Sequence, residues 1–461
     1  MAYYGANTSG GGSDIRPREL VTEAVYLADT DVDYSDFDND GNGSVDGVYV
    51  IYAGYGEEYS GVSTDAIWAH AWGIPTVTLD GKTISRYSCS SELRGNSGTN
   101  LCRIGVICHE FGHVLGSPDF YDTNYATGGQ YSGTGYWDLM ASGSWNNSGA
   151  TPAHHNAYTK VYVYSWATAT TKSAGALITL YNAEENSNSF YRYNTTTANE
   201  YFLMENRQQH KFDNNIPGHG MIIYHIDGTY IASAGNLINA GIHQGMYPVC
   251  ANAAGNPTAV YGTINGTGCP FPGTSSITSF TDVTTPYSLS WALANTDKPI
   301  TDITEDVGAK TVTITFMGGP VAGLWTGAVS NNWGTAGNWD DLNVPDSDVD
   351  VVINAGAANM PEVNESTASP AACNTLTIDE DATLTINEGK ALTASGNTTN
   401  NGTFTLKSDA TGTGGFIDNG TIGGTGTFNV NKYLTGSGGS TPNGSFLVYR
   451  ISCFFNNKHN L

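Results

Sequence analysis

Positive charge is scarce in this sequence. Lysine and arginine together number 18, against 43 aspartates and glutamates, so the formal net charge is −25 at pH 7. Proteins that bind nucleic acid or anionic membrane surfaces need basic side chains to neutralise phosphate groups. The composition therefore argues against both kinds of partner.

Long apolar runs are missing as well. No stretch of about 18 consecutive apolar residues occurs, so the sequence predicts no membrane-spanning helix. Residues 1–7, Met-Ala-Tyr-Tyr-Gly-Ala-Asn, carry neither a basic segment nor an apolar core, so no signal peptide is visible. A chain of 461 residues is too long for one ordinary core, and we expect two or three domains.

Cysteine is sparse: the chain has seven, and none has C-x-x-C spacing. Zinc bound by thiolates and thiol redox chemistry are therefore weakly supported. Cys250 and Cys269 bracket a loop rich in glycine, asparagine and proline, and we expect a disulfide between them. Cys89 could pair with Cys102 or Cys108, and the sequence does not choose between them. Free or buried thiols are the alternative for all seven.

What the sequence does contain is an H-E-x-x-H motif, formed by His109, Glu110 and His113. Apolar residues recur at helical spacing from Ile104 to Leu115, which predicts a helix with this apolar stripe buried. On a helix the two histidines lie one turn apart on the same face, so both imidazoles can bind one metal ion. Glu110 would lie beside the metal, placed to take a proton from water.

A carboxylate follows the motif at a suitable distance. Asp119 comes six residues after His113, and Gly116 between them lets the chain reverse. Two neutral imidazoles and one carboxylate leave a fourth position open, as in catalytic zinc sites. We therefore predict the two histidines and Asp119 as zinc ligands and Glu110 as the general base. Asp122 is the alternative third ligand but would need a second reversal of the chain. The alternative is that the H-E-x-x-H motif occurs by chance on a helix of the core and binds no metal.

The residues from His109 to Asp122, His-Glu-Phe-Gly-His-Val-Leu-Gly-Ser-Pro-Asp-Phe-Tyr-Asp, resemble the immune inhibitor A family of secreted bacterial zinc metallopeptidases, whose sites are metzincin-like. Residues 137–145, Trp-Asp-Leu-Met-Ala-Ser-Gly-Ser-Trp, resemble that family's methionine turn. The resemblance implies that Met140 packs beneath the metal without binding it. Residues 201–208 and 217–227 resemble two further signatures, so the likeness extends over roughly residues 2–317.

The resemblance implies an α+β, metzincin-like catalytic domain over residues 1–170 and a β-rich C-terminal part of the peptidase region over residues 171–318. Members of the family normally carry a signal peptide, a propeptide and further strands ahead of the matched region, so we expect the catalytic domain to be N-terminally incomplete. The implied function is that of a secreted zinc endopeptidase acting on proteins or peptides, outside a bacterium or at its surface. The alternative is a catalytically inert extracellular binding or structural protein whose C-terminal module is the functional part.

Residues 36–46, Asp-Phe-Asp-Asn-Asp-Gly-Asn-Gly-Ser-Val-Asp, are strongly acidic. Counted as an EF-hand-type loop, they supply calcium ligands from Asp38, Asp40, Asn42, the carbonyl of Ser44, and Asp46. Tyr49 replaces the glutamate expected at the twelfth position, so another carboxylate is needed. Candidates for it are Asp36, Glu57 and Glu58. We predict that the loop binds calcium, with a solvated turn as the alternative, and that residues 48–53 form a buried strand.

Gly318-Gly319-Pro320 marks a boundary. Beyond it threonine alternates with apolar residues in short repeats, at residues 375–378, 383–386, 403–406 and 427–430. The pattern predicts an all-β module over residues 319–461, either a right-handed solenoid-like stack of strands or a sandwich, similar to repeat modules of bacterial surface proteins. Residues 446–461 abandon the pattern, which indicates a truncated module.

Overall fold

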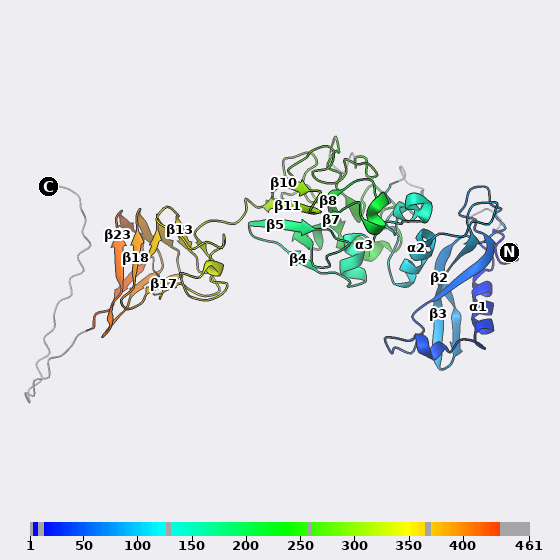
Figure 1. The fold of residues 1–461 in the computed structure, drawn as a ribbon, viewed down its shortest axis with the longest axis horizontal. Coiled ribbons are helices and arrows are strands. Elements are labelled where there is room, and N and C mark those ends of the chain that lie inside the picture. The colour runs from blue at the N-terminus through cyan, green and yellow to red at the C-terminus, as the bar shows by residue number, and fades with distance from the viewer. Residues whose placement is uncertain (1–2, 8–12, 126–130, 256–260, 365–369, 434–461) are drawn as a thin grey trace, which may run out of the picture. The chain divides into compact units, whose positions relative to one another are not determined.

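The structure of the chain is a computed structural model that divides into two compact units, Met1–Gly319 and Pro320–Leu461 (Figure 1). It describes residues 3–7, 13–125, 131–255, 261–364 and 370–433. Residues 446–461, where the sequence indicates truncation, lie outside this part. No helix in the described ranges is long and apolar enough to cross a membrane.

The first unit begins with helix α1 (Pro17–Ala28), which packs on a three-stranded sheet (Figure 1). The sheet has the order β1-β3-β2: β1 (Val48–Tyr55) runs parallel to β3 (Lys82–Leu93), and β2 (His70–Leu79) runs antiparallel to it. A short 3-10 helix, η1 (Tyr34–Phe37), lies between α1 and β1. The buried side chains between helix and sheet come from all these elements: Val21, Val25, Tyr34, Tyr52, Ile74, Val77 and Ile84.

Strand β1 differs from expectation. Of its eight residues only Tyr52 is buried, and the side chain of Ile51 is 60% exposed. The prediction of a buried strand is wrong, because β1 lies at one edge of the sheet and has β3 as its single neighbour. An apolar run alone does not distinguish a central strand from an edge strand.

Helix α2 (Ile104–Val114) carries the H-E-x-x-H motif. The helix is where the sequence predicts it, but its buried face is different: Ile104, Phe111 and Leu115 are exposed, whereas Gly105 and Gly112 are buried. A Cβ on Gly105 would collide with the carbonyl oxygen of Ser144. Small residues therefore allow α2 to lie close to the segment behind it. That segment contains three short helices: η2 (Gly135–Trp137), η3 (Ser142–Gly149) and the π-helix η4 (Thr159–Val163).

The remainder of the first unit is built on two sheets (Figure 1). The five-stranded sheet has the order β4-β6-β7-β8-β9, with strands Ala169–Thr171, Phe190–Asn194, Glu200–Arg207, Gly220–Asp227 and Met246–Pro248. The three-stranded sheet has the order β10-β11-β5, with strands Ile300–Asp306, Thr311–Phe316 and Ala176–Tyr181. A 3-10 helix, η5 (Lys211–Asn215), follows β7, and helix α3 (Gly228–Ala234) follows β8.

Strands β7 and β8 are buried on both faces. On one face Leu203 and Tyr224 share a core with Trp137 and Met140 from the segment behind α2. On the other face alternate residues such as Phe202 pack against the three-stranded sheet. The five-stranded sheet thus packs directly against the segment behind α2. On this face of the sheet, the described residues before and after residue 171 share one hydrophobic core.

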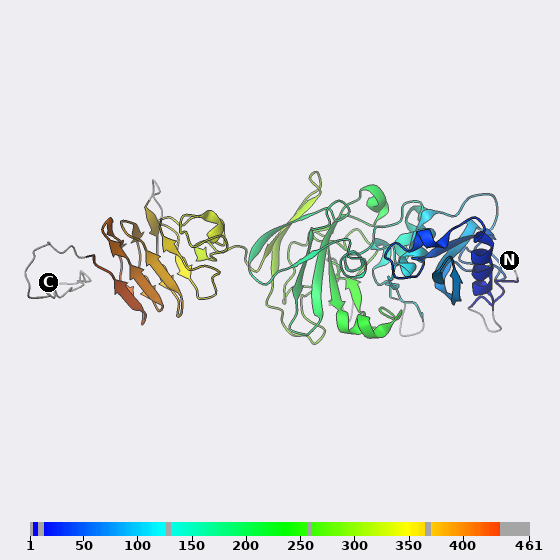
Figure 2. The same ribbon diagram turned by 90° about the horizontal axis from the view of Figure 1, so that it is seen from below.

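The second unit is a stack of parallel strands in three sheets (Figure 2). In chain order the strands are β12 (Leu324–Trp325), β13 (Val351–Ile353), β14 (Glu362–Val363), β15 (Ala371–Cys373), β16 (Leu376–Ile378), β17 (Thr383–Ile386), β18 (Ala391–Ala394), β19 (Thr398–Asn400), β20 (Thr403–Leu406), β23 (Gly415–Asp418), β24 (Ile422–Gly423) and β25 (Thr427–Val430). A 3-10 helix, η6 (Ala336–Asn338), and a small hairpin, β21 (Ser408–Asp409) with β22 (Gly412–Thr413), complete it.

Equivalent apolar residues stack from one layer to the next: Leu384 pairs with Phe404, and Phe404 with Phe428. Because sandwiches are built from antiparallel strands, the parallel pairing confirms the solenoid-like alternative and rules out the sandwich. Three buried tryptophans, Trp325, Trp333 and Trp339, pack together at the start of the module.

Candidate metal centre and active site

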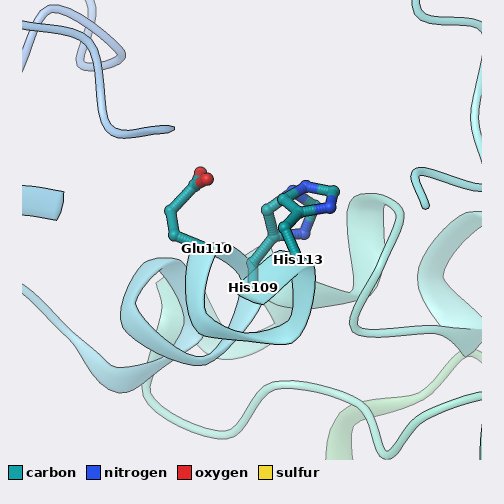
Figure 3. A group of neighbouring side chains, drawn as sticks. All are labelled: His109, Glu110 and His113. Carbon is teal, nitrogen blue, oxygen red and sulfur yellow. The ribbon is translucent and has the colours of Figure 1, made fainter. Parts of the chain in front are cut away.

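Helix α2 presents His109, Glu110 and His113 from one turn (Figure 3). The two imidazole rings meet edge to face with their centroids 4.9 Å apart, and the Glu110 carboxylate projects from the same turn, with one oxygen within 4.8 Å of a ring nitrogen of each histidine. The helix stops because Gly116 has a φ of +105°, which residues with a Cβ avoid. The N–H of Ser117 then donates to the carbonyl of Gly112, and the chain turns back toward the histidines.

The carboxylate of Asp119 faces both imidazoles. Its Oδ1 atom lies 3.2 Å from Nε2 of His109 and 3.3 Å from Nε2 of His113. Asp122 instead accepts the N–H groups of Asn124 and Tyr125 within the following loop. The structure therefore brings Asp119, and not Asp122, to the two histidines.

The opposite ring nitrogens show which atoms are free to bind a metal. Nδ1 of His109 lies 2.8 Å from the carbonyl oxygen of Leu139, and Nδ1 of His113 lies 2.8 Å from that of Ser117. A carbonyl oxygen can only accept, so both Nδ1 atoms donate, and each imidazole in its neutral, metal-binding form directs a lone pair from Nε2 toward Asp119. Among the described residues, no group donates a well-formed hydrogen bond to the buried Oδ1 atom of Asp119. Three electron-pair donors thus converge on one point.

The spacing of these three atoms fits zinc. A tetrahedral ion with bonds of about 2.0–2.1 Å has its ligand atoms about 3.3 Å apart. The two distances from Asp119 to the histidines, 3.2 and 3.3 Å, have this length. Two imidazoles and one carboxylate are also the chemistry that zinc binds, so the residues present fit the ion.

The charges around His109, Glu110, His113 and Asp119 also favour a bound cation. Burial lowers the pKa of His109, but the carboxylates of Asp119 and Glu110 outweigh burial and raise it to about 9. Burial would raise the pKa of Asp119, whereas the two imidazoles hold it well below its usual range. For Glu110 burial raises the pKa although both histidines oppose this, which makes its carboxylate a better proton acceptor.

Asn236 positions Asp119 from a distant part of the chain. Its side-chain oxygen accepts the N–H of Asp119, and its amide nitrogen donates to Oδ2 of the same carboxylate, both at 2.8 Å. With Oδ2 held in this way, Oδ1 is directed to the histidines. Sequence reasoning missed Asn236, which lies just after α3 and 117 residues beyond its partner. Nothing in its local sequence marks it as part of the site.

Met140 lies buried directly beneath α2. A Cβ added to Gly112 would be only 2.6 Å from its sulfur, so the glycine between the two histidines makes room for it. The turn is held from the large sheet by the fully buried Arg207, whose guanidinium donates to the carbonyl of Trp137 at 2.7 Å. Arg207 also pairs with Asp213 at 2.7 Å. The methionine turn is thus fixed from below by β7.

The acidic loop gathers three carboxylates. Oxygen atoms of Asp38, Asp40 and Asp46 lie within 4.8 Å of one another. Asn42 bonds to Asp40 through its amide nitrogen, and the hydroxyl of Ser44 bonds to Thr83. Lys82 contributes a positive charge, with its Nζ atom 2.6 Å from Oδ2 of Asp38.

The carboxylates considered as additional calcium ligands do not join this cluster. Glu57 bonds to Asn7 at 2.8 Å, and Glu58 accepts the N–H of Ala69. These two residues line separate cavities elsewhere in the domain. The cluster therefore contains the carboxylates of Asp38, Asp40 and Asp46 but not those of Glu57 and Glu58.

The cysteines considered for disulfides are free thiols in the structure. Cys250 and Cys269 are both buried and their side chains interact, while Cys250 also donates to Asn252 at 3.0 Å. The bridge between them is not formed here and stays a prediction. Cys89, Cys102 and Cys108 are unbridged too.

A helix bearing H-E-x-x-H, with a carboxylate facing both histidines and a methionine beneath them, resembles the active centre of a metallopeptidase. Comparison with known proteins agrees. Residues 1–168 match the family described as the catalytic domain of immune inhibitor A peptidase M6. The resemblance to immune inhibitor A peptidases is thereby confirmed for this region. Residues 324–436 match a family described only as a domain of unknown function.

Two curated relatives show the same likeness. The pre-pro-metalloprotease PrtV of Vibrio cholerae serotype O1 is 34% identical over a region covering 35% of this chain and 20% of the relative. Immune inhibitor A of Bacillus thuringiensis subsp. alesti is 31% identical over 35% of this chain and 27% of its own length. The matched region thus spans about a fifth to a quarter of these relatives.

Proposed function

We propose that this protein is a secreted, zinc-dependent endopeptidase that hydrolyses peptide bonds of proteins. The observation that carries the proposal is that Oδ1 of Asp119 lies 3.2 and 3.3 Å from the Nε2 atoms of His109 and His113, beside the buried Glu110. In this proposal the N-terminal part is an α+β fold of the metzincin type. Its site of action is outside a bacterium or at its surface, as the resemblance implies.

His109, His113 and Asp119 hold the zinc ion in this proposal. When bound, zinc would polarise the scissile carbonyl and make a water molecule more acidic. Glu110 takes the proton from the attacking water and passes it to the leaving amine. Its raised pKa suits the first step, because a more basic carboxylate accepts a proton more readily.

A cleft of about 650 Å³ runs past the site and suits an extended peptide. Residues 68–73 form one side of it, and His109, Glu110, Tyr121 and Asn236 lie across from them. Strand β2 is an edge of its sheet, with β3 as its single partner. An edge strand offers free backbone groups with which a substrate chain can pair. We also propose that the loop with Asp38, Asp40 and Asp46 binds calcium.

Zinc content and proteolysis test the proposal together. The purified chain should contain a single zinc ion, and should cleave casein. A chelator such as 1,10-phenanthroline should abolish cleavage, and added zinc should restore it. Full zinc occupancy without cleavage of casein or a peptide library would instead favour the inert extracellular binding protein, and absence of zinc binding would contradict the metal centre itself.

A further inference from the structure

A second cavity opens beside Glu110 and His109. It has a volume of about 320 Å³. Its walls come from α2, the loop that follows α2, the segment after Met140 and residues ahead of β2. They include Val106, Tyr121, Ser142, Ser144 and Trp145. At about 30 Å³ per water molecule the cavity has room for roughly ten waters, which is enough for one long side chain. Because Glu110 and His109 line this cavity as well as the main cleft, it adjoins the proposed site of cleavage.

Glu58 supplies the charge of this cavity. Its Oε2 atom accepts the N–H of Ala69 at 3.1 Å, whereas its Oε1 atom is buried and has no hydrogen-bond partner among the described residues. A Cβ at residue 56 would collide with this carboxylate, so Gly56 leaves the space in which the side chain of Glu58 folds back. The carboxylate is therefore fixed by one oxygen and free at the other.

No lysine or arginine in the described part of the chain pairs with Glu58. In the described part of the chain no ion pair includes it, and the charged neighbours that act on it most are Glu57 and Glu110, both carboxylates. The pKa of Glu58 is raised to about 7, chiefly by burial, and the two carboxylates contribute in the same direction. A cation placed next to Oε1 would relieve both the desolvation and the repulsion.

We propose that the Glu58 pocket binds a lysine or arginine side chain of the substrate, at one fixed position next to the scissile bond. The inference rests on the proposed peptidase function and specifies its substrate class. Val106 and Trp145 would pack on the aliphatic stem, since long basic side chains bury their methylene groups and leave the charged end for a partner. The carboxylate of Glu58, one of the residues that line the pocket, would accept a charge-assisted hydrogen bond from the basic group.

If Glu58 had only a structural role, replacing it would have a different effect on substrate preference. If the side chain only anchored the N–H of Ala69, a glutamine would serve equally, because its amide oxygen can accept the same bond. The variant Glu58→Gln therefore separates the two roles. Glu57→Gln is the matched control: its residue is adjacent and equally acidic, but bonds to Asn7 and lines a different cavity.

The test measures kcat/KM for two peptides that differ only by lysine or norleucine at the preferred position, after that position has been mapped by mass spectrometry of casein fragments. Wild-type protein should prefer lysine by about tenfold to a hundredfold, as loss of a hydrogen bond to a charged group predicts. Glu58→Gln should lose this preference while cleaving the norleucine peptide within about threefold of wild type, and Glu57→Gln should keep it. A wild type without preference for basic residues, or a preference that survives in Glu58→Gln, would overturn the proposal.

A protein that cleaves nothing would contradict the peptidase function, and the pocket is then judged by binding. Saturation-transfer NMR would compare n-pentylammonium with 1-pentanol, which have the same chain but differ in charge. Binding of the ammonium alone, weakened severalfold in Glu58→Gln, supports a pocket for basic side chains. Equal binding of both compounds, or no effect of the variant, overturns it.

Discussion

Asp119 uses its two carboxylate oxygens for different purposes. Oδ2 is held by Asn236, and Oδ1 is directed at both histidines. Asp122, three residues further on, is equally buried but serves its own loop. The two aspartates therefore form a matched pair for mutation, similar in burial and different in role.

Asp119→Asn should weaken zinc binding by at least about a hundredfold, because the amide replaces a charged ligand and even residues that only support a ligand change affinity by 10- to 100-fold. Asp122→Asn should leave zinc affinity close to that of the wild type. Competition with a fluorescent zinc chelator measures both constants. A normal affinity in Asp119→Asn, with a loss in Asp122→Asn, would reverse the assignment of the third ligand.

For single residues, the sequence predicts contacts between residues that are close along the chain, and it misses contacts between residues that are far apart. The spacing of His109 and His113 and the glycine turn before Asp119 depend on a few consecutive residues, so a helix and a chain reversal suffice to foresee them. Asn236 reaches the site through the packing of the large sheet, which no local pattern encodes. The sequence predicts the wrong buried face for α2 for a related reason. Gly105 and Gly112, rather than the apolar stripe, face the segment that contains Met140.

At the scale of the elements, the acidic loop between η1 and β1 leads to a testable prediction about calcium binding. Its three carboxylates lie close together, yet Lys82 neutralises one of them by pairing with Asp38. Calcium would have to displace this ammonium group from Oδ2. The affinity is therefore set by a competition between a divalent ion and a side chain of the same domain.

Calcium should raise the melting temperature of the zinc-loaded chain by several degrees, since a ligand at 100 times its Kd stabilises the folded state by about 2.7 kcal/mol. Lys82→Met should tighten binding, because it removes the competing charge, whereas Asp40→Asn should weaken it. Differential scanning calorimetry with and without calcium, at constant zinc, measures these shifts. Identical melting temperatures for wild-type protein in both buffers, together with no effect in Lys82→Met, would show that the loop is a solvated turn.

Element types were easier to predict than their surroundings. Helix α2 follows from the periodicity of its apolar residues. The exposure of β1 could not be foreseen, because an apolar run has the same pattern at the centre and at the edge of a sheet. The alternation of threonine with apolar residues after residue 370 did specify inward and outward faces, and Leu384, Phe404 and Phe428 stack accordingly.

For the whole molecule, the division at Gly319 separates a peptidase-like unit from a solenoid-like one. Residues 1–168 provide the complete set of proposed zinc ligands and the general base, while Asn236 comes from the sheet region beyond them. Loss of that sheet would therefore release Asp119 as well as expose the core around Met140. We therefore expect the proposed peptidase activity to need residues beyond the matched region.

The most direct measurement of the central claim is casein hydrolysis by Glu110→Gln at full zinc occupancy. Glutamine has the size of glutamate but cannot accept the proton of the attacking water, so zinc should stay bound while the rate falls by about 10²–10⁴-fold. Zinc content by elemental analysis, measured on the same sample, separates loss of metal from loss of the base. A variant that retains zinc and cleaves casein at the wild-type rate would contradict the account.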